Sequence, residues 1–534
     1  MAALVACASR KPPAPLPPLP HVAYAHYLDG KLAVYRSDWG AAADALAQAL
    51  AAAPDQPMIA VELARAQAKA KRDAAARDTL AAARKRWPAH PQVWLASGDL
   101  LGGVEAIRAY RRVIELEPDD ERGYLGLAKL ERPDEAEAIL HQLVERIPAS
   151  VDGHYRLALR LAQRDELAAA MTHLRAVLEL DPDHIDARLD LARALRRTGH
   201  IEEAISQTRG AFDRAGQPLD IAEELYWLLC EADDQTAAID LLTLLDDDRS
   251  DTDALAVVAR LYRGLGRLAD ARAIATRIAA LDADAGVIAT AEVELDSGEP
   301  AAAAKRVLAI PGDSPRFAEA RRLATEALLA AGDPRAALAA IAPARTAFPA
   351  DEEIAMAAAF AAADAGDPVG ARAALSAVGE LERPLARARL EDRLGDHAAA
   401  IALLEGYLAK NPDSATALNL AGFLLADANQ RLPDAERWLR HARELAPGDP
   451  AVLDSWGWLL LRKGAVRDAV RVLDRASRFA PRQAEVLVHL ATAWAADHAP
   501  RTAAAVLDRA GALHPPAVVL RRIDAVRATL SRTR

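Results

Sequence analysis

Residues 448–481 read GDPAVLDSWGWLLLRKGAVRDAVRVLDRASRFAP, and the spacing of small and large side chains in this stretch decides the fold. Gly457 and Ala469 are small, and a large apolar residue, Leu473, follows Ala469 by four positions. Apolar residues three or four apart lie on one face of a helix, and small residues on such faces let two antiparallel helices approach closely. Gly464 lies between the two halves, where glycine commonly ends a helix. The stretch therefore predicts a helical hairpin.

The same arrangement recurs along the chain at a fixed period. In the segment that ends at Pro182, Ala158 and Ala170 take the two small positions and Leu174 the large one. Proline marks the end of many of these segments. The prolines separated by 34 or 35 residues are Pro54 and Pro88, Pro148 and Pro182, Pro412 and Pro447, Pro447 and Pro481, and Pro481 and Pro515. A period of this length is typical of repeat architectures, so we predict an array of hairpins.

The composition favours helices and excludes several classes of protein. Of 534 residues 52% are hydrophobic but only 4% are aromatic, so alanine and leucine supply most of the apolar content. Both favour helices, whereas strands prefer β-branched and aromatic side chains. The net charge of -11 repels phosphate backbones, which argues against nucleic-acid binding. Cys7 and Cys230 are too few for a disulfide framework or a four-cysteine zinc site, and no apolar run is long enough to span a bilayer.

Counted from the start of each repeat, small residues take the eighth and twentieth positions and large residues take the eleventh and twenty-fourth. Together with the proline at the end of the repeat, this pattern resembles the tetratricopeptide repeat. The resemblance implies an all-α fold, a right-handed superhelix (α-solenoid) of about 15 helix pairs over residues 21–515. Each pair is expected to be stabilised mainly by its neighbours. The small residues expected at the twentieth position are Ala42, Ala76, Ala106, Ala136, Ala170, Ala204, Ala238, Ala271, Ala303, Ala337, Ala371, Ala400, Ala435, Ala469 and Ala503.

Parts of the array depart from the period. The repeats that end at Pro118 and Pro148 are each four residues short, so a helix or a turn must be trimmed. Between about 212 and 315 the terminal proline is missing or displaced, which predicts a bend or looser stacking. Residues 516–534 contain an amphipathic segment, Ala517 to Leu530, that we expect to form a helix capping the last repeat.

Residues 1–20 differ in character from the rest of the chain. The sequence from Leu4 to Cys7 resembles the lipobox of bacterial lipoproteins, which implies lipidation of Cys7, followed by a Pro-rich tether. Only six residues precede Cys7, so a complete signal peptide would need a start upstream of Met1. Ala8 is not the aspartate that retains lipoproteins in the inner membrane, which implies an outer membrane lipoprotein facing the periplasm. The alternative is a cytoplasmic protein in which the four-residue match is a coincidence.

The C-terminal repeats carry a more specific resemblance. From Leu418 the chain reads LNLAGFLLAD, and one repeat later DSWGW. This resembles a branch of tetratricopeptide proteins from proteobacterial envelopes with the consensus LN-x2-GY-x-LAD and then DS-x-GW. The matching residues are Asn419, Gly422, Phe423, Asp427, Asp454, Ser455, Gly457 and Trp458, with Phe423 in place of the usual tyrosine. The resemblance implies an envelope location and assembly, secretion or polysaccharide machinery as partners.

The sequence contains no recognisable catalytic or metal-binding constellation. H-E-x-x-H, the phosphate-binding G-x4-G-K-[ST] and G-x-S-x-G are all absent. The 13 histidines are scattered, and no two have the i, i+4 spacing that places both on one helical face. Acidic pairs such as Glu202-Glu203 lie near expected helix starts, where the helix dipole explains them. We therefore expect neither an enzyme nor a cofactor.

Candidate binding residues follow from the first helix of each repeat, which lines the concave face in peptide-binding members of the family. The positions of the first helix that face inward in those family members are occupied in the C-terminal repeats by seven residues: Asn419, Phe423, Asp454, Trp458, Arg462, His489 and Thr492. They would line a groove for a protein partner; the alternative is that Trp458 and Phe423 only pack between repeats. In the earlier repeats the same positions give a basic strip of Tyr155, Arg156, Arg193, Arg196 and Arg197. This strip would either bind an anionic ligand or form a solvated helix face.

The leading hypothesis is a non-catalytic scaffold that binds partner proteins and contacts the membrane only through a lipid on Cys7. The second hypothesis is a cytoplasmic assembly chaperone or regulatory adaptor with the same architecture. An enzyme within residues 212–315 is disfavoured, because that segment is helical by pattern and too short for a separate catalytic domain.

Overall fold

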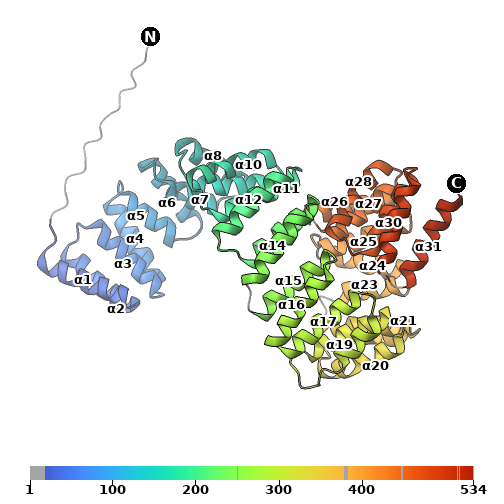
Figure 1. Cartoon of the computed structure of the whole chain (residues 1–534). Helices are drawn as coiled ribbons and strands as arrows, with labels where there is room; N and C mark the ends of the chain where they lie inside the picture. Colours follow the sequence, from blue (N-terminus) through green and yellow to red (C-terminus); the bar gives the residue numbers. More distant parts are fainter. Residues whose placement is uncertain are drawn as a thin grey trace, which may run out of the picture. The chain divides into compact units, whose positions relative to one another are not determined.

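The computed structural model describes residues 18–248, 251–377, 383–446, 449–513, 515 and 517–532. In these ranges the chain forms 31 α-helices and one short 3-10 helix, and no strand (Figure 1). Successive helices form fifteen antiparallel pairs, and a final unpaired helix follows. The predicted all-α solenoid with about 15 pairs is therefore confirmed.

The first helices of the pairs are α1 (His21–Tyr35), α3 (Pro57–Lys69), α5 (Pro91–Leu100), α7 (Glu121–Leu130), α9 (Val151–Gln163), α11 (Ile185–Arg197), α13 (Leu219–Glu231), α15 (Thr252–Gly264), α17 (Ala283–Asp296), α19 (Phe317–Ala330), α21 (Glu352–Asp364), α23 (Arg383–Arg393), α25 (Ala415–Asp427), α27 (Pro450–Arg462) and α29 (Ala484–Ala496). The second helices are α2 (Trp39–Ala52), α4 (Asp73–Arg86), α6 (Gly103–Leu116), α8 (Pro133–Arg146), α10 (Leu167–Leu180), α12 (Ile201–Arg214), α14 (Gln235–Asp248), α16 (Leu268–Leu281), α18 (Pro300–Leu308), α20 (Pro334–Ala347), α22 (Pro368–Ala374), α24 (His397–Leu408), α26 (Leu432–Leu445), α28 (Val466–Phe479) and α30 (Pro500–Ala512). The 3-10 helix η1 is Leu375–Ala377, and the last helix is α31 (Ala517–Arg532).

The fifteen predicted alanines occupy one equivalent position throughout. Each is the fourth residue of its second helix. Ala76 is 4% exposed and the other fourteen are fully buried. In the pair α25/α26 a Cβ added to Gly422 of the first helix would lie 3.2 Å from the backbone carbonyl oxygen of Ala435, so the two helices approach closely at this position. At Gly457, the small residue of a first helix, an added Cβ would lie 2.5 Å from Cγ of Leu473.

The turn inside most pairs has one residue in the left-handed conformation, two positions after the first helix ends. In several pairs this residue is a glycine: Gly199, Gly266, Gly332, Gly366, Gly395 and Gly464 all have φ between 73° and 83°. Glycine adopts this conformation without a steric penalty. Residues with a Cβ take the same position elsewhere, for example Lys71 and His498.

The two short repeats lose three of their four residues from the first helix and one from the turn that follows it. α5 and α7 have ten residues each, whereas their partners α6 and α8 have fourteen. Tyr110 of α6 packs tightly between these trimmed helices, because a Cβ at either Gly98 or Gly126 would collide with its ring. Its hydroxyl donates a hydrogen bond to the Asp99 carboxylate at 2.9 Å.

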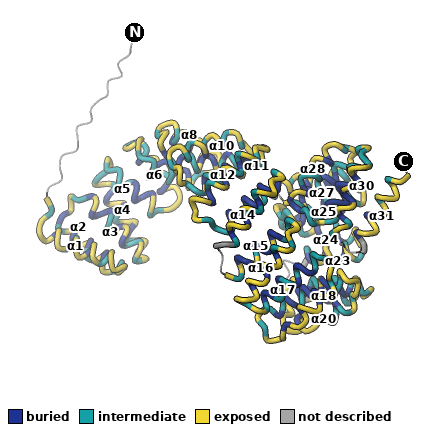
Figure 2. Tube along the Cα trace, viewed as in Figure 1, coloured by how far each residue is buried: buried dark blue, intermediate teal, exposed yellow. Residues whose placement is uncertain are grey.

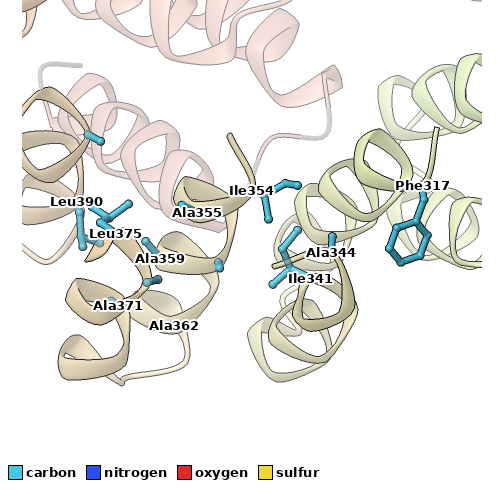
Figure 3. Packing of buried hydrophobic residues seen from close by; sticks show 13 residues of the cluster. Phe317, Ile341, Ala344, Ile354, Ala355, Ala359, Ala362, Ala371, Leu375 and Leu390 are labelled. Carbon is cyan, nitrogen blue, oxygen red and sulfur yellow. The ribbon is translucent and has the colours of Figure 1, made fainter. Parts of the chain in front are cut away.

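Burial follows the contacts between helices rather than a single centre (Figure 2). One cluster runs from Phe317 through Ile341 and Ile354 to Leu390, across the five α-helices α19 to α23 and η1 (Figure 3). Such overlapping clusters are what a stack of repeats requires, since each pair buries its apolar faces against its neighbours.

The chain divides into two compact units, Met1–Arg214 and Ala215–Arg534. The division falls at the start of the stretch in which the proline period fails. Within that stretch α13 to α18 still form three pairs, with Ala238, Ala271 and Ala303 fully buried. At the C-terminal end, Val519 and Ile523 of α31 are buried against α29 and α30. Arg521 and Arg522 of α31 are exposed, as in a helix that caps the array.

Candidate partner-binding surface

The seven C-terminal candidate residues lie on three successive first helices. Asn419 and Phe423 belong to α25, Asp454, Trp458 and Arg462 to α27, and His489 and Thr492 to α29. α25 contacts α27, and α27 contacts α29. The repeat brings these residues together, because positions one repeat apart lie side by side on neighbouring first helices.

A buried pair of Asp454 and His489 joins the last two of these helices. Nδ1 of His489 lies 3.0 and 2.9 Å from the two carboxylate oxygens of Asp454. The whole residues are 8% and 4% exposed. The imidazole N–H donates to the carboxylate, which satisfies both polar groups away from water. The indole ring of Trp458 stacks on the His489 ring, with the centroids 4.3 Å apart.

Trp458 and Arg462 both bind Asp427, at the end of the preceding first helix. The indole N–H of Trp458 donates to the Asp427 carboxylate at 3.0 Å. Nη2 of Arg462 donates to the Asp427 backbone carbonyl at 3.0 Å, and the guanidinium lies over the indole, 4.7 Å from its centroid. Trp458 itself is buried, whereas Arg462 is exposed.

The candidates therefore divide into supporting and accessible residues. Asp454, Trp458 and His489 are buried between repeats; of these three residues, the sequence alternative of packing between repeats named only Trp458. Phe423 is half-buried, and its ring centroid lies 6.0 Å from that of His489. Thr492 is half-buried and donates to the carbonyl of Val488 in its own helix. Phe423, Arg462, Thr492 and the half-buried Asn419 are thus the members that keep exposed surface.

Asn419 has a polar atom that its surroundings do not satisfy. The residue is half-buried, and its side-chain carbonyl oxygen is buried without a hydrogen-bond donor in the described part of the chain. A buried acceptor of this kind favours a donor when one becomes available.

The basic strip lies on α9 and α11 and is interleaved with acidic residues. The hydroxyl of Tyr155 donates to Asp190 at 2.9 Å, and Nη1 of Arg193 lies 3.0 Å from the other oxygen of that carboxylate. Burial, together with the Asp190 carboxylate, raises the pKa of Tyr155 above its ordinary value. Arg197 pairs with Asp165 at 2.5 Å.

These acidic partners reduce the positive charge that the strip offers to a ligand. Of its other members, Arg156 is exposed and Arg196 is half-buried. Binding of an anion to the strip stays a prediction.

Sequence reasoning missed a group of three histidines on α8, α9 and α10. Nδ1 of His154 lies 2.9 Å from Nδ1 of His173, and the His141 and His173 ring centroids are 6.3 Å apart. The signal was the spacing of 19 residues, which separates facing positions on the two helices of one pair. Arg188 and Gln207 show the same spacing in the next pair. Within the described ranges, no group of three or more histidine, cysteine or acidic residues is arranged to hold a metal ion.

Cys7 and most of the Pro-rich tether lie outside the described residues. Among the helices that the structure describes, none combines the length and apolar character that crossing a membrane requires.

Comparisons with known proteins agree with the repeat architecture. Two tetratricopeptide repeat family models match, one at residues 161–218 and the other at 27–101, 127–185 and 385–450. The TPR repeat-containing protein PA4667 of Pseudomonas aeruginosa is 39% identical over 104 residues. That match spans 20% of this chain and only 18% of the relative's length.

Two solved structures align with this chain over most of their length, but their TM-scores are low. A chain of the crystal structure of the APC/C hetero-tetramer Cut9-Hcn1 is 15% identical, with 94% of this chain and 96% of that chain covered and a TM-score of 0.32. A chain of the structure of Naa15/Naa10 bound to HypK-THB is 13% identical, with 91% and 99% covered and a TM-score of 0.30. Scores this low identify neither a shared partner nor a shared activity. The family models identify tetratricopeptide repeats at residues 27–101, 127–218 and 385–450, and the common alanine position extends the same helix packing to all fifteen pairs.

Proposed function

We propose that this chain is a non-catalytic scaffold that binds partner proteins along its first helices. The observation that carries the proposal is the common position of the fifteen buried alanines, which fixes how every pair packs. Because packing uses the same positions in each repeat, the outward positions of the first helices are free to differ. A surface of this kind is suited to recognition of extended or helical protein segments.

In the C-terminal repeats the proposed contact surface consists of Asn419, Phe423, Arg462 and Thr492. Arginine and aromatic side chains contribute much of the binding energy in protein interfaces. The buried network of Asp454, Trp458 and His489 supports this surface from beneath, so little conformational entropy is lost when a partner binds.

We also propose that the scaffold is anchored at the periplasmic face of the outer membrane by a lipid on Cys7. The support is the lipobox-like sequence before Cys7 and the envelope-type consensus in the C-terminal repeats. Its partners would then be proteins of envelope assembly, secretion or polysaccharide machinery. If the anchor is absent, the same surface would serve a cytoplasmic chaperone or adaptor.

The binding surface is tested by substituting its exposed members rather than its supports. Phe423→Ala with Arg462→Ala should lower capture of partners by roughly tenfold or more, because two anchor side chains are lost. Capture would be measured by crosslinking in intact cells followed by quantitative mass spectrometry. Trp458→Ala is less informative, since removal of a buried indole leaves a cavity.

The matched control is Arg440→Ala on the second helix α26, where Arg440 is exposed and pairs with Glu436 of its own helix. The control variant should capture the same proteins as the wild type. Equal capture by the double variant and the control would remove Phe423 and Arg462 from the proposed surface.

The anchor is tested separately by labelling cells with radioactive palmitate. The wild-type chain, expressed from its native start, should incorporate label and sediment with membranes, and Cys7→Ser should do neither. An unlabelled wild type, or a Cys7→Ser variant that still sediments with membranes, would refute lipidation without affecting the binding surface.

A further inference from the structure

The second unit makes a contact that a simple stack of repeats does not predict. α13, the first helix of this unit, packs against α28, which belongs to the pair seven repeats later. In a repeat array each pair is expected to contact only its neighbours. The polar contacts described next therefore have large sequence separations, 247 residues between Arg478 and Glu231 and 186 between Arg482 and Asp296.

The first part of this contact centres on Glu231, the last residue of α13. Its carboxylate forms an ion pair with the Arg475 guanidinium of α28, and the Glu231 side chain is only 4% exposed. Nη1 of Arg478, one turn further along α28, donates to the backbone carbonyl of Glu231 at 3.5 Å. A carboxylate buried this deeply depends on its cation, because removing one partner leaves an uncompensated charge.

The second part involves Arg482, in the turn that follows α28. Its Nη2 donates to the backbone carbonyl of Asp296, at the end of α17, at 2.7 Å. The same atom lies 3.8 Å from the Asp296 carboxylate, which also accepts from Nε of Arg263 at 2.5 Å. A Cβ added to Gly266, in the turn after α15, would lie 3.6 Å from Nη1 of Arg482. Arg482 thus reaches two further pairs of the unit.

The third part is apolar. Trp227 of α13 packs against a buried cluster that includes Phe479 and Ala476 of α28. Its indole also contacts the ring of Tyr226 edge-on, with centroids 5.0 Å apart. Tyr226 is 1% exposed and donates to the carbonyl of Leu261 in α15 at 3.0 Å. Trp227 is therefore held in place by the packing of its own helix.

We name these residues the clasp: Trp227, Glu231 and Asp296 on one side and Arg475, Arg478 and Arg482 on the other. All its cations come from α28 and the turn after it, and all its acceptors come from α13 and α17. The three arginine side chains are between 20% and 40% exposed, so salt ions can reach them.

We propose that the clasp is a salt-sensitive latch that holds the pairs from α13/α14 to α27/α28 in a closed turn. While it is closed, the curvature of these pairs is fixed. Its release lets small rotations between neighbouring pairs add up, which changes the spacing of the first-helix side chains. The latch thereby adjusts the inner surface of the unit without altering any individual repeat.

The test compares the full-length wild type with the double variant Arg475→Gln, Arg482→Gln. Amide hydrogen exchange in residues 219–231 should become roughly tenfold faster or more, because α13 loses its contact with α28. The radius of gyration from small-angle scattering should increase, while far-UV circular dichroism stays unchanged. Unchanged exchange in α13 together with an unchanged radius of gyration would overturn the proposal.

Arg471→Gln is the matched control, because Arg471 lies on the same helix but is 79% exposed and pairs with Asp468 one turn away. The control variant should have the hydrogen exchange and the radius of gyration of the wild type. If Arg471→Gln changes both as much as the double variant does, the effect is not specific to the clasp and the proposal is contradicted. If the double variant loses helicity, the proposal is tested instead on the wild type, by measuring its radius of gyration and helicity from about 0.05 to about 1 M NaCl. A radius of gyration that rises at constant helicity supports the latch, and one that stays constant overturns it.

Discussion

At the scale of single residues, the same side chains that suggest a binding site also hold neighbouring repeats together. Asp454 and His489 satisfy each other in a buried hydrogen bond, and Trp458 covers them. The sequence identified all three by position, since the repeat fixes which residues of successive first helices are adjacent. It left open whether they face solvent, because the same position is exposed or covered according to the size of the neighbouring side chains.

The tight packing of Tyr110 makes a residue-level prediction in the first unit. Gly126→Ala should destabilise this unit by about 1–3 kcal/mol, because the added methyl group overlaps a ring that is 8% exposed and has little room to move. Gly102→Ala is the control, since nothing lies within 4 Å of a Cβ there. Thermal unfolding of the two variants checks this, and equal melting temperatures would contradict the packing described.

The histidine group predicts a local dependence on pH. Burial, and then the charges of His154 and His141, lower the pKa of His173 below its ordinary value. The folded chain therefore prefers the neutral ring, so the stabilisation is present above the unfolded pKa of about 6.5 and is lost as pH falls through the folded pKa. The protection factors of amides in α9 and α10, which correct the exchange rate for its intrinsic pH dependence, should fall on acidification, and less so in His173→Gln.

Exposed His21 provides the control for this experiment. His21→Gln should leave the pH dependence of exchange in α9 and α10 as in the wild type. An identical acid response in His173→Gln would show that His173 does not govern it.

At the scale of helices and turns, the identity of the residue in the left-handed conformation affects the stability of the turn that joins the two helices of a pair. Lys71 has φ of 62°, and it is exposed, whereas Gly464 has φ of 79° at the equivalent place. Lys71→Gly should raise stability by about 0.5–1 kcal/mol through relief of strain, and Gly464→Ala should lower it by about 1 kcal/mol. Chemical denaturation measures both changes, and shifts in the same direction would argue against this role of the turn.

Helix boundaries could be predicted from the sequence where position-specific residues repeat. The alanines expected at the twentieth position of each repeat all lie at the fourth position of a second helix, and Gly464 lies in the turn of its pair. The trimmed helices α5 and α7 were not resolved, because a deficit of four residues fits a shorter helix or a shorter turn equally well. The structure shortens both, by three residues in the helix and one in the turn, and Tyr110 packs against the shortened helices at Gly98 and Gly126.

At the scale of the whole molecule, the period predicted the number of pairs but not every contact between them. The clasp joins Glu231 to Arg475, and neither residue carries a signal in a 34-residue repeat. Contacts across several repeats depend on the small rotation between successive pairs, which accumulates over the array and is not encoded in any single position. The proline period fails from about residue 212, close to the division between the two units.

The most direct test of the scaffold proposal is site-specific photocrosslinking in living cells. A photoreactive amino acid would be placed at Phe423, on a first helix, or at Arg440, on the neighbouring second helix. The account predicts discrete protein adducts from position 423 that are absent from position 440. No adducts from 423, or the same set from both positions, would contradict a binding surface on the first helices.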